Sequence, residues 1–591
     1  MRRAACPGGI IRILRRGAGL ASALCCAVLL APPPAQARSA LDYATLMGGV
    51  YPQPVDFSAY APEAGASAPT HEFSGVLRLW FHGTLPHHTL HADPAYVDAA
   101  DLASALTWPG DFAYEFVQQG AMLLPVRRGA IPGSHAWWEL VLEPGRAWNE
   151  AGDHGLSRAA IPFALQERNA NCTHNGVLMF LFGDDGAVSR TAMQVTSETC
   201  LYLQVDLWGL LQTQYRPGTP AQGAAAVRAY RDELAARLPR RTLAQLHADH
   251  PQLDVAALAI GAPSASTVHG LVVDGVNYVS DCATRSGAYP YCDELDLPSY
   301  SLAKSLFAAT ALMRLQLQHP GAAAQSLAAH VPQCRGAAWR GVRFIDALDM
   351  ATGNYDSDRF EADELGAKSA GLFLPLGHRD KIRFACNAWA HHDPPGTRWV
   401  YHTSDTYLLG TALAHYLRSL PGRQADDLYR DLVYEQVYAP LGLSATTAVT
   451  RRTYDAVAQP FTGWGLTFKP GDIARLGRFY AVDRGAIDGK PLLDPALLDQ
   501  ALQRDPGARG LPVAGFPDLR YQHGFWARNV RTVLGCAHDT WVPFMSGFGG
   551  ISVVLFPNGV VYYNFADDAQ PASFDWAASA REARKLGDYC Q

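Results

Sequence analysis

Apolar residues follow one pattern in the first part of the chain, from residue 38 to about residue 215. Short apolar runs such as "VLRLWFHG", "FAYEFVQQ", "WWELVLE" and "VLMFLFG" alternate there with Gly, Asp and Asn turns, which is typical of β-strands. We therefore expect a sandwich or a similar β-domain over residues 38–215. The stretch "YRPGTPAQG" is typical of a linker, and "AAAVRAYRDELAARL" predicts a polar helix, so residues 216–264 are expected to connect the β-domain to the rest of the chain.

The pattern changes near residue 265. The run "HGLVVDGVNYVSDC" predicts a β-hairpin that turns at Asp274-Gly275, and "GISVVLFPNGVVYYNFAD" predicts a second hairpin near the end of the chain. Apolar residues at helical spacing predict helices between them at 296–318, 408–419 and 425–437, and a last helix at 573–586. This order predicts an α+β domain over 265–591, with one largely antiparallel sheet flanked by helices.

The predicted helix at 296–318 carries the first candidate chemistry. Pro298 and Ser299 predict its start, so Ser301 and Lys304 would share one face of its first turn. A serine hydroxyl can pass its proton to a neutral amine, and a helix N-terminus stabilises the negative charge that develops. Lys304 is the first of only six lysines in a chain that mostly uses arginine, and a desolvated lysine, unlike an arginine, can lose its proton near neutral pH. The same spacing also fits an exposed helix start.

Further stretches favour the chemical interpretation. They are "VRFIDALDMATGNYDS", "PPGTRWVYHTSDTYLLGTALAHYL", "GWGLTFKPGDIARLGRFY" and "FMSGFGGISVVLFPNGVVYYN", and they come after the Ser-x-x-Lys helix in that order. Together these segments resemble the serine β-lactamase and DD-peptidase superfamily, in particular its class C-like branch of periplasmic hydrolases, esterases and 6-aminohexanoate-oligomer hydrolases. The resemblance spans about 265–590 and implies the β-lactamase/transpeptidase-like fold for that region.

The resemblance also implies roles. Ser301 would be the nucleophile that forms an acyl-enzyme, and Lys304 would take its proton. Tyr401, with a pKa lowered by Lys304, would relay protons to the leaving group and from water. The backbone N–H groups of Ser301 and Phe548 would form the oxyanion hole. The remaining substrate-binding positions implied by the resemblance are Thr403, Ser546 and Gly547.

Two positions depart from the family pattern. Thr403 stands where an Asn or Ser is usual, and Met545 stands where a Lys or His is usual. The cation that would face a substrate carboxylate is therefore missing, which favours a neutral ester or amide. The main prediction is an exported serine hydrolase that cleaves an ester or amide. The alternatives are a DD-peptidase or β-lactamase acting on cell-wall peptide or β-lactam, and a non-catalytic envelope binding protein on a hydrolase scaffold.

The composition limits the kinds of partner that we expect for this protein. The 591 residues are 48% hydrophobic and 18% charged, with a net charge of −6, which indicates a globular protein and no nucleic-acid partner. Residues 1–37 combine arginines, an apolar run and the small-residue site "AQA", which predicts a cleaved signal peptide and a periplasmic or secreted protein. We expect no stable membrane span after its removal, no cofactor, and a small ester, amide or cell-wall-derived substrate.

The cysteines fit export. Eight of the 11 lie beyond residue 37, an even number suited to disulfides in an oxidising compartment. Pairing of neighbours predicts Cys172–Cys200, Cys282–Cys292, Cys334–Cys386 and Cys536–Cys590, out of many possible connectivities. The cluster of His82, His87, His88 and His91 is interpreted as a polar loop rather than a metal site. Trp137 and Trp138 are expected to pack in the core rather than to line a glycan groove.

Overall fold

The computed structural model describes residues 40–259, 266–422, 426–566 and 574–590. Residues 38–591 form one compact unit. The predicted signal peptide at 1–37 lies outside the described residues. Among the described residues, no helix is both long and apolar enough to span a membrane.

The N-terminal part of the described chain forms a ten-stranded antiparallel sheet. Its strands are β1 (Gly75–Trp80), β2 (His87–Ala92), β3 (Phe112–Gln119), β4 (Met122–Pro125), β5 (Trp138–Leu142), β6 (Gly145–Trp148), β7 (Ser157–Glu167), β8 (Thr173–Phe182), β9 (Thr191–Thr199) and β10 (Leu203–Pro217). The order is β1-β3-β4-β6-β7-β8-β9-β10-β2, with β5 on β7, and an additional pairing of β1 with β10 closes the sheet on itself. The prediction of a β-rich N-terminal region is confirmed.

The closed sheet differs from the expected sandwich. Strand β10 is 15 residues long, so its successive parts pair with β2, with β9 and with β1. One long strand can therefore join both ends of the sheet, and closure leaves fewer exposed edges than two open sheets would. Because β10 continues to Pro217, the expected linker at 215–223 begins later than predicted, and α3 (Gly223–Ala236) comes directly after it.

The C-terminal part of the described chain forms a nine-stranded sheet in the order β11-β13-β12-β25-β24-β23-β22-β21-β20. Its strands are β11 (Arg240–Thr242), β12 (Ser266–Val273), β13 (Val276–Val279), β20 (Leu511–Val513), β21 (Phe516–Gln522), β22 (Phe525–Asn529), β23 (Trp541–Gly547), β24 (Ile551–Leu555) and β25 (Val561–Ala566). Both predicted hairpins, β12–β13 and β24–β25, are present. Asp274 and Gly275 both have positive φ, as a tight two-residue hairpin turn requires.

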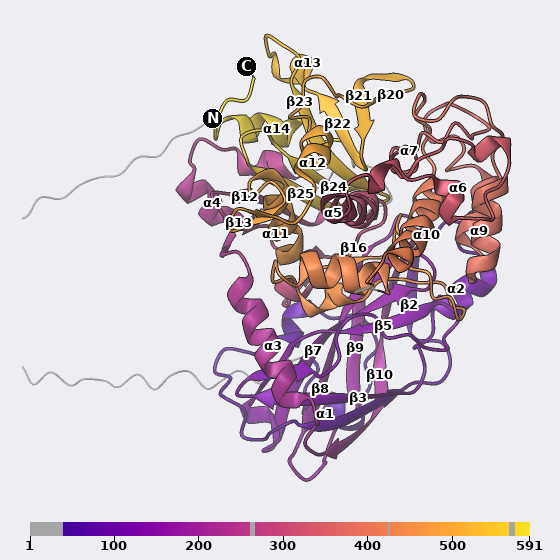
Figure 1. The fold of residues 1–591 in the computed structure, drawn as a ribbon. Coiled ribbons are helices and arrows are strands. Elements are labelled where there is room, and N and C mark those ends of the chain that lie inside the picture. The colour runs from indigo at the N-terminus through magenta and orange to yellow at the C-terminus, as the bar shows by residue number, and fades with distance from the viewer. Residues whose placement is uncertain (1–39, 260–265, 423–425, 567–573, 591) are drawn as a thin grey trace, which may run out of the picture. The chain divides into compact units, whose positions relative to one another are not determined.

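Helices α5, α10 and α11 lie between the two sheets (Figure 1). The helices of this part are η5 (Lys304–Ala309), α5 (Thr310–Gln318), α7 (Phe344–Leu348), α9 (His378–Asn387), α10 (Thr403–Ser419), η9 (Leu428–Tyr438), α11 (Pro470–Ala481), α12 (Pro495–Ala501) and α14 (Ala577–Arg584). The remaining α-helices are α1 (Tyr43–Gly48), α2 (Ala99–Ala105), α4 (Leu243–Asp249), α6 (Leu327–His330), α8 (Ala370–Phe373) and α13 (Arg531–Leu534). The predicted helices at 408–419, 425–437 and 573–586 are confirmed, with boundaries shifted by a few residues.

The predicted helix start at Pro298 and Ser299 is wrong. Leu297–Pro298 instead forms strand β16, which pairs with β17 (Thr467–Phe468). The N–H of Ser299 also donates to the carbonyl of Leu466 at 3.0 Å. This pairing keeps Leu297–Pro298 extended, and the chain becomes helical only at Leu302.

Buried charged pairs join the closed sheet to the helices. Lys469 Nζ lies 2.9 Å from Glu143 Oε1 and 2.8 Å from Asp296 Oδ1, and all three side chains are almost fully buried. Arg451 forms a second buried pair with Glu139 of β5. Apolar side chains from both sheets belong to one continuous hydrophobic core. These contacts explain why residues 38–591 form one compact unit.

The described residues contain four disulfides, Cys172–Cys200, Cys282–Cys292, Cys334–Cys386 and Cys536–Cys590. They are the four pairings of neighbouring cysteines that the sequence predicts. Closing the shorter loops costs less entropy, which favours the pairing of neighbours. Four disulfides fit a protein of an oxidising compartment such as the periplasm or the extracellular space.

Candidate active site

Ser301 lies on a tight turn between strand β16 and the helix that begins at Leu302. The preceding residue, Tyr300, has a φ of 39°, which places a bulky residue in the left-handed region. Such a conformation is strained and persists only where the surroundings hold it. Within the turn, the N–H of Lys304 donates to the carbonyl of Ser301 at 3.0 Å. The turn therefore places the side chains of Ser301 and Lys304 side by side, as the sequence predicts.

Lys304 is the centre of the site. Its Nζ donates to Ser301 Oγ at 3.0 Å, to Thr403 Oγ1 at 2.8 Å and to the carbonyl of Gly463 at 3.5 Å. The side chain is buried. Burial lowers the pKa of Lys304 to about 8, although the carboxylates of Glu364 and Glu361 act in the opposite direction. A substantial fraction of this amine is therefore neutral near physiological pH, and it can accept the proton of Ser301.

Tyr401 lies against the amine, with Lys304 Nζ 4.7 Å from the centre of the tyrosine ring. The expectation of a lowered pKa is wrong, because the pKa of Tyr401 is raised well above its usual range. Burial is the main cause, and the carboxylates of Glu364 and Glu361 add to it, while a hydrogen bond with Ser301 partly offsets them. Tyr401 therefore stays a neutral phenol that can donate its proton.

Thr403, the first residue of α10, links Lys304 to a carboxylate that the sequence did not single out. Its hydroxyl accepts from Lys304 and donates to Glu364 Oε1. Its N–H also donates to Glu364 Oε2 at 3.0 Å. The result is a continuous chain of hydrogen bonds through Ser301, Lys304, Thr403 and Glu364. Glu364 lies in "FEADELG", a stretch with no motif, and only its excess of acids could have drawn attention to it.

Strand β23 brings the third group of predicted residues to the turn that carries Ser301. A Cβ on Gly547 would lie 2.9 Å from the carbonyl oxygen of Ser299, so only glycine allows this strand to approach the turn so closely. Ser546 pairs with Ser552 on β24. Phe548 directly follows Gly547, the last residue of β23. Met545 is buried in the core. Because methionine is uncharged, this position offers no cation to the site.

Gly463 closes the same site from another side. A Cβ there would lie 2.6 Å from Thr406 Oγ1 and 2.7 Å from Thr403 Cγ2. The absence of a side chain lets its carbonyl approach Lys304. The predicted residues Ser301, Lys304, Tyr401 and Thr403 are thus brought together, and β23 lies beside them.

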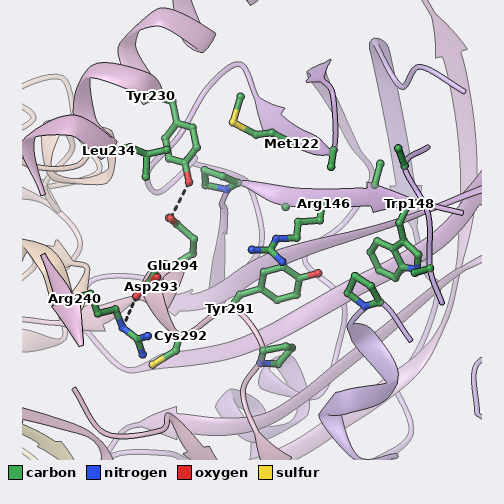
Figure 2. A pocket seen from close by; sticks show the side chains of 18 of the residues that line it. Met122, Arg146, Trp148, Tyr230, Leu234, Arg240, Tyr291, Cys292, Asp293 and Glu294 are labelled. Carbon is green, nitrogen blue, oxygen red and sulfur yellow. Dashed lines mark hydrogen bonds and ion pairs between the residues drawn. The ribbon is translucent and has the colours of Figure 1, made fainter. Parts of the chain in front are cut away.

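A separate cavity of 740 Å³ lies between β6, α3 and the segment around residue 292. Figure 2 shows that Tyr230 bonds Glu294 and that Arg240 pairs with Asp293 along one of its walls. None of the predicted catalytic residues lines this cavity. The candidate catalytic residues and the cavity therefore lie in different places in the fold.

The other sequence candidates stay outside the site. His87, His88 and His91 lie on strand β2 rather than in the expected loop, because β2 pairs with the first residues of β10. In the part of the chain that the structure describes, no three His, Cys, Asp or Glu side chains are grouped as metal ligands. Trp137 and Trp138 are both buried, which confirms their assignment to the core.

Residues 297–558 match the family model described as Beta-lactamase. This segment contains Ser301, Lys304, Tyr401 and Thr403, and it has the β-lactamase/transpeptidase-like fold that the sequence predicts. The fold supports a serine hydrolase in general. The family match supports the general resemblance, whereas it does not distinguish among the branches.

Several solved structures are similar in fold. The hydrolase EstCE1, described as having promiscuous acyltransferase activity, is 16% identical with a TM-score of 0.40, covering 62% of this chain and 100% of that one. A D-stereospecific amidohydrolase from Streptomyces sp. is 14% identical with a TM-score of 0.40, covering 58% and 98%. A penicillin-binding protein homolog from Caulobacter crescentus is 17% identical with a TM-score of 0.36, covering 61% and 97%. No curated protein matches the sequence.

Proposed function

We propose that this protein is an exported serine hydrolase that cleaves an ester or amide through an acyl-enzyme on Ser301. The observation that carries the proposal is the position of Lys304. Its Nζ lies 3.0 Å from Ser301 Oγ, and burial lowers its pKa to about 8. A buried amine of this kind, next to an otherwise weak nucleophile, is how such enzymes activate serine.

Acylation would begin when neutral Lys304 takes the proton of Ser301 as Oγ attacks the substrate carbonyl. The negative charge on the carbonyl oxygen would be stabilised by the N–H groups of Ser301 and Phe548, a type of contact worth about 3 kcal/mol per donor. Collapse of the tetrahedral intermediate then expels the alcohol or amine, which needs a proton. Tyr401, a neutral phenol, would donate it.

Deacylation would reverse these roles. Water attacks the acyl-enzyme, and its proton passes to the deprotonated Tyr401. Lys304 Nζ lies over the ring of this tyrosine. Ser301 leaves with a proton from Lys304, which restores the starting state. Thr403 keeps Lys304 directed at Ser301 throughout, because its hydroxyl is itself held by Glu364.

The charges of the site support a neutral substrate. Position 545 carries a buried methionine in place of a cation, and the carboxylate of Glu364 acts on Lys304. A substrate carboxylate would meet repulsion there rather than a partner. The proposal therefore favours esters and amides without a carboxylate beside the scissile bond, over β-lactams and cell-wall stem peptides.

The first test is covalent labelling of the mature protein with a fluorophosphonate, followed by intact-mass measurement. We expect one adduct on the wild type, none on Ser301→Ala, and a rate at least about 100-fold lower on Lys304→Ala. Ser305→Ala is the matched control, since Ser305 lies on the same helix but bonds the carbonyl of Gly524, and it should label like the wild type. A folded wild type that takes no label would refute the proposal and favour a binding protein.

Substrate panels would then separate the hydrolase classes. We expect turnover of neutral esters or amides and slow turnover of cephalosporins and carbapenems. Rapid β-lactam hydrolysis by the pure protein would instead identify a β-lactamase, and it would show that a cation at position 545 is not needed for carboxylate recognition.

A further inference from the structure

A cluster of four aromatic rings joins the N-terminal sheet to the candidate active site. Tyr96 stacks on Tyr202 with ring centres 5.1 Å apart, and both face Phe548, at 6.0 and 6.4 Å. Tyr300, the residue before the nucleophile, lies 5.9 Å from the same ring. Three of the rings are buried or partly buried, whereas Tyr96 is 44% exposed. The exposed ring thus belongs to the N-terminal part of the chain.

Tyr96 lies near the candidate site rather than on a remote surface. Phe548 comes directly after Gly547, whose strand touches the nucleophile turn. Glu364, on the other side of Lys304, is near enough to contribute to the raised pKa of Tyr96. The ring of Tyr96 is therefore next to Phe548 and near Glu364, the carboxylate that bonds Thr403.

The loop that carries Tyr96 is firmly held. The N–H of Asp93 donates to the carbonyl of Tyr202 at 2.9 Å, and the N–H of Val97 donates to the carbonyl of Asp93 at 2.9 Å. A fixed, half-exposed ring costs little entropy when it packs against a ligand, which is why aromatic residues are effective in binding sites.

We propose that Tyr96 and Phe548 form a subsite for an aromatic or branched apolar acyl group, an inference that rests on the proposed acyl-enzyme function. If the N–H of Phe548 binds the substrate carbonyl, the acyl group attached to that carbonyl would lie beside these two rings. The N-terminal part of the chain would then take part in choosing the substrate, since its loop between β2 and α2 supplies the exposed ring.

The test compares 4-nitrophenyl phenylacetate with 4-nitrophenyl acetate on wild type, Tyr96→Ala and Tyr96→Phe. We expect kcat/KM for the phenylacetate to fall about tenfold in Tyr96→Ala with little change for the acetate, and Tyr96→Phe to match the wild type. An equal effect on both esters would overturn the subsite while leaving the hydrolase intact. A wild type that neither labels with fluorophosphonate nor cleaves either ester would overturn both proposals.

Asn171 supports an independent inference about the same N-terminal sheet. It lies in the loop between β7 and β8 and is fully buried. Its Oδ1 accepts from the N–H of Tyr300 at 2.9 Å, from the N–H of Gly465 at 2.9 Å and from Ser299 Oγ at 3.1 Å. Its Nδ2 donates to the carbonyl of Leu466 at 3.3 Å. One amide thus bonds both segments that flank Lys304.

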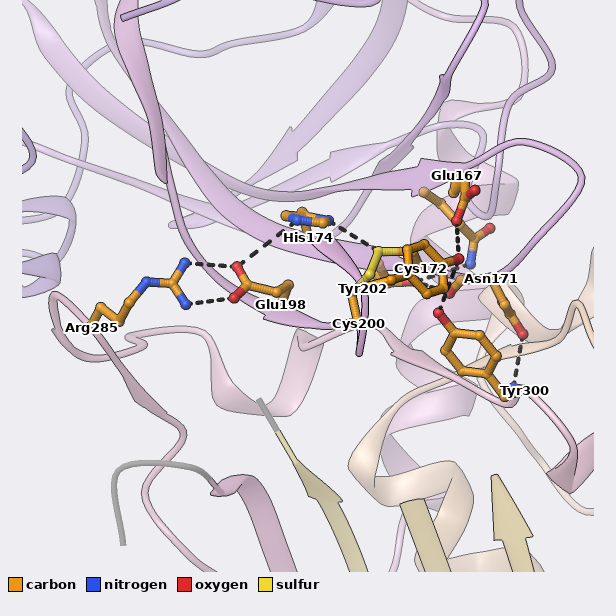
Figure 3. The surroundings of a disulfide bond; sticks show 11 residues. Glu167, Asn171, Cys172, His174, Glu198, Cys200, Tyr202, Arg285 and Tyr300 are labelled. Carbon is orange, nitrogen blue, oxygen red and sulfur yellow. Dashed lines mark hydrogen bonds and ion pairs between the residues drawn. A yellow bond between two sulfur atoms is a disulfide. The ribbon is translucent and has the colours of Figure 1, made fainter. Parts of the chain in front are cut away.

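The position of Asn171 is itself fixed. The next residue, Cys172, forms a disulfide with Cys200, and the N–H of Glu167 donates to the carbonyl of Cys172 at 2.8 Å. Figure 3 shows Asn171 bonded to the backbone of Tyr300, with the Cys172–Cys200 disulfide in the same region. Tyr300 has the strained φ of 39°, so it needs partners that hold it.

We infer that Asn171 is a positioning residue for the nucleophile. It holds the backbone of Tyr300, and therefore Ser301, against the segment whose Gly463 carbonyl faces Lys304. Loss of these bonds would let the turn relax, and a displacement of about 1 Å at a nucleophile can reduce the rate about 100-fold.

Asn171→Ala, Asn171→Asp and Asn175→Ala test this role. Asn175 is an equally buried amide of the same sheet, but it bonds the backbone of Asp296. The readout is kcat per fluorophosphonate-labelled site, so that unfolded molecules do not count. We expect about a 100-fold loss in Asn171→Ala, partial recovery in Asn171→Asp, which keeps the acceptor oxygens, and less than about a threefold change in Asn175→Ala. A kcat for Asn171→Ala close to that of the wild type, or an equal loss in Asn175→Ala, would overturn the inference.

Discussion

Lys304 determines the pH range of the proposed reaction, because only its neutral form can take the proton of Ser301. Burial lowers its pKa from 10.5 to about 8. The neutral fraction therefore increases as pH rises through about 8, and kcat/KM for a neutral ester should increase with it and level off above about pH 9. A pH profile of kcat/KM between about 6 and 10 measures this. A flat profile, or a rise centred near the ordinary lysine value of 10.5, would contradict the assignment of Lys304 as the base.

Glu364 should tune this profile. Its carboxylate raises the pKa of Lys304, so Glu364→Gln should move the rise in kcat/KM to lower pH, while the amide oxygen can still accept from Thr403. Glu435→Gln, a change at a glutamate of η9, is the control and should leave the profile unchanged. A shift to higher pH in Glu364→Gln would show that the carboxylate acts on another group.

At the residue scale the sequence could predict the side chains that belong to motifs. The motifs that contain Ser301, Lys304, Tyr401 and Thr403 have an order and a spacing that can be recognised in the sequence alone. Glu364 and Asn171 could not be predicted, because each acts through contacts with residues far away in the sequence. The predicted lowering of the pKa of Tyr401 was also wrong, since burial raises this pKa and the carboxylates of Glu364 and Glu361 add to the effect.

At the scale of elements, the site depends on how closely β23 approaches the nucleophile turn. Gly547→Ala would place a methyl group 2.9 Å from the carbonyl of Ser299 and 3.0 Å from Ile551, so the strand or the turn must shift. We expect kcat to fall at least about tenfold while the protein stays folded by circular dichroism. Gly133→Ala is the control, because a Cβ there meets its nearest atom only at 4.0 Å. Equal activity in the two variants would show that the close approach is not needed.

The start of the nucleophile helix shows why local patterns misplace elements. Proline is a common first residue of helices, and the apolar residues after Pro298 recur at helical spacing. Strand β17, which is distant in the sequence at Thr467–Phe468, pairs with Leu297–Pro298 and keeps them extended. The two hairpins were predicted correctly, because their strands are adjacent in sequence and their turns carry Asp-Gly and Asn-Gly.

At the scale of the whole molecule, buried charges make the two sheets depend on each other. Lys469→Met would leave Glu143 and Asp296 without their shared partner, which should lower the free energy of unfolding by about 3–5 kcal/mol. Urea unfolding measures this. Lys368→Met is the control, since the exposed pair of Lys368 with Asp356 is worth at most about 1 kcal/mol. Similar losses in both variants would contradict the structural role given to the buried cluster.

The sequence by itself determined the β-rich and α+β regions, the pairs of cysteines and the motif residues of the site, because these depend on short-range periodicity, turn chemistry and ordered spacing. The tertiary structure decided three other things: the closure of the first sheet by β10, the chain of hydrogen bonds that ends at Glu364, and the contacts of Asn171 and Tyr96 with the nucleophile region. Each of these joins residues that are distant in sequence. Such contacts form only when the whole chain packs, since no local pattern records which distant groups a fold will bring together.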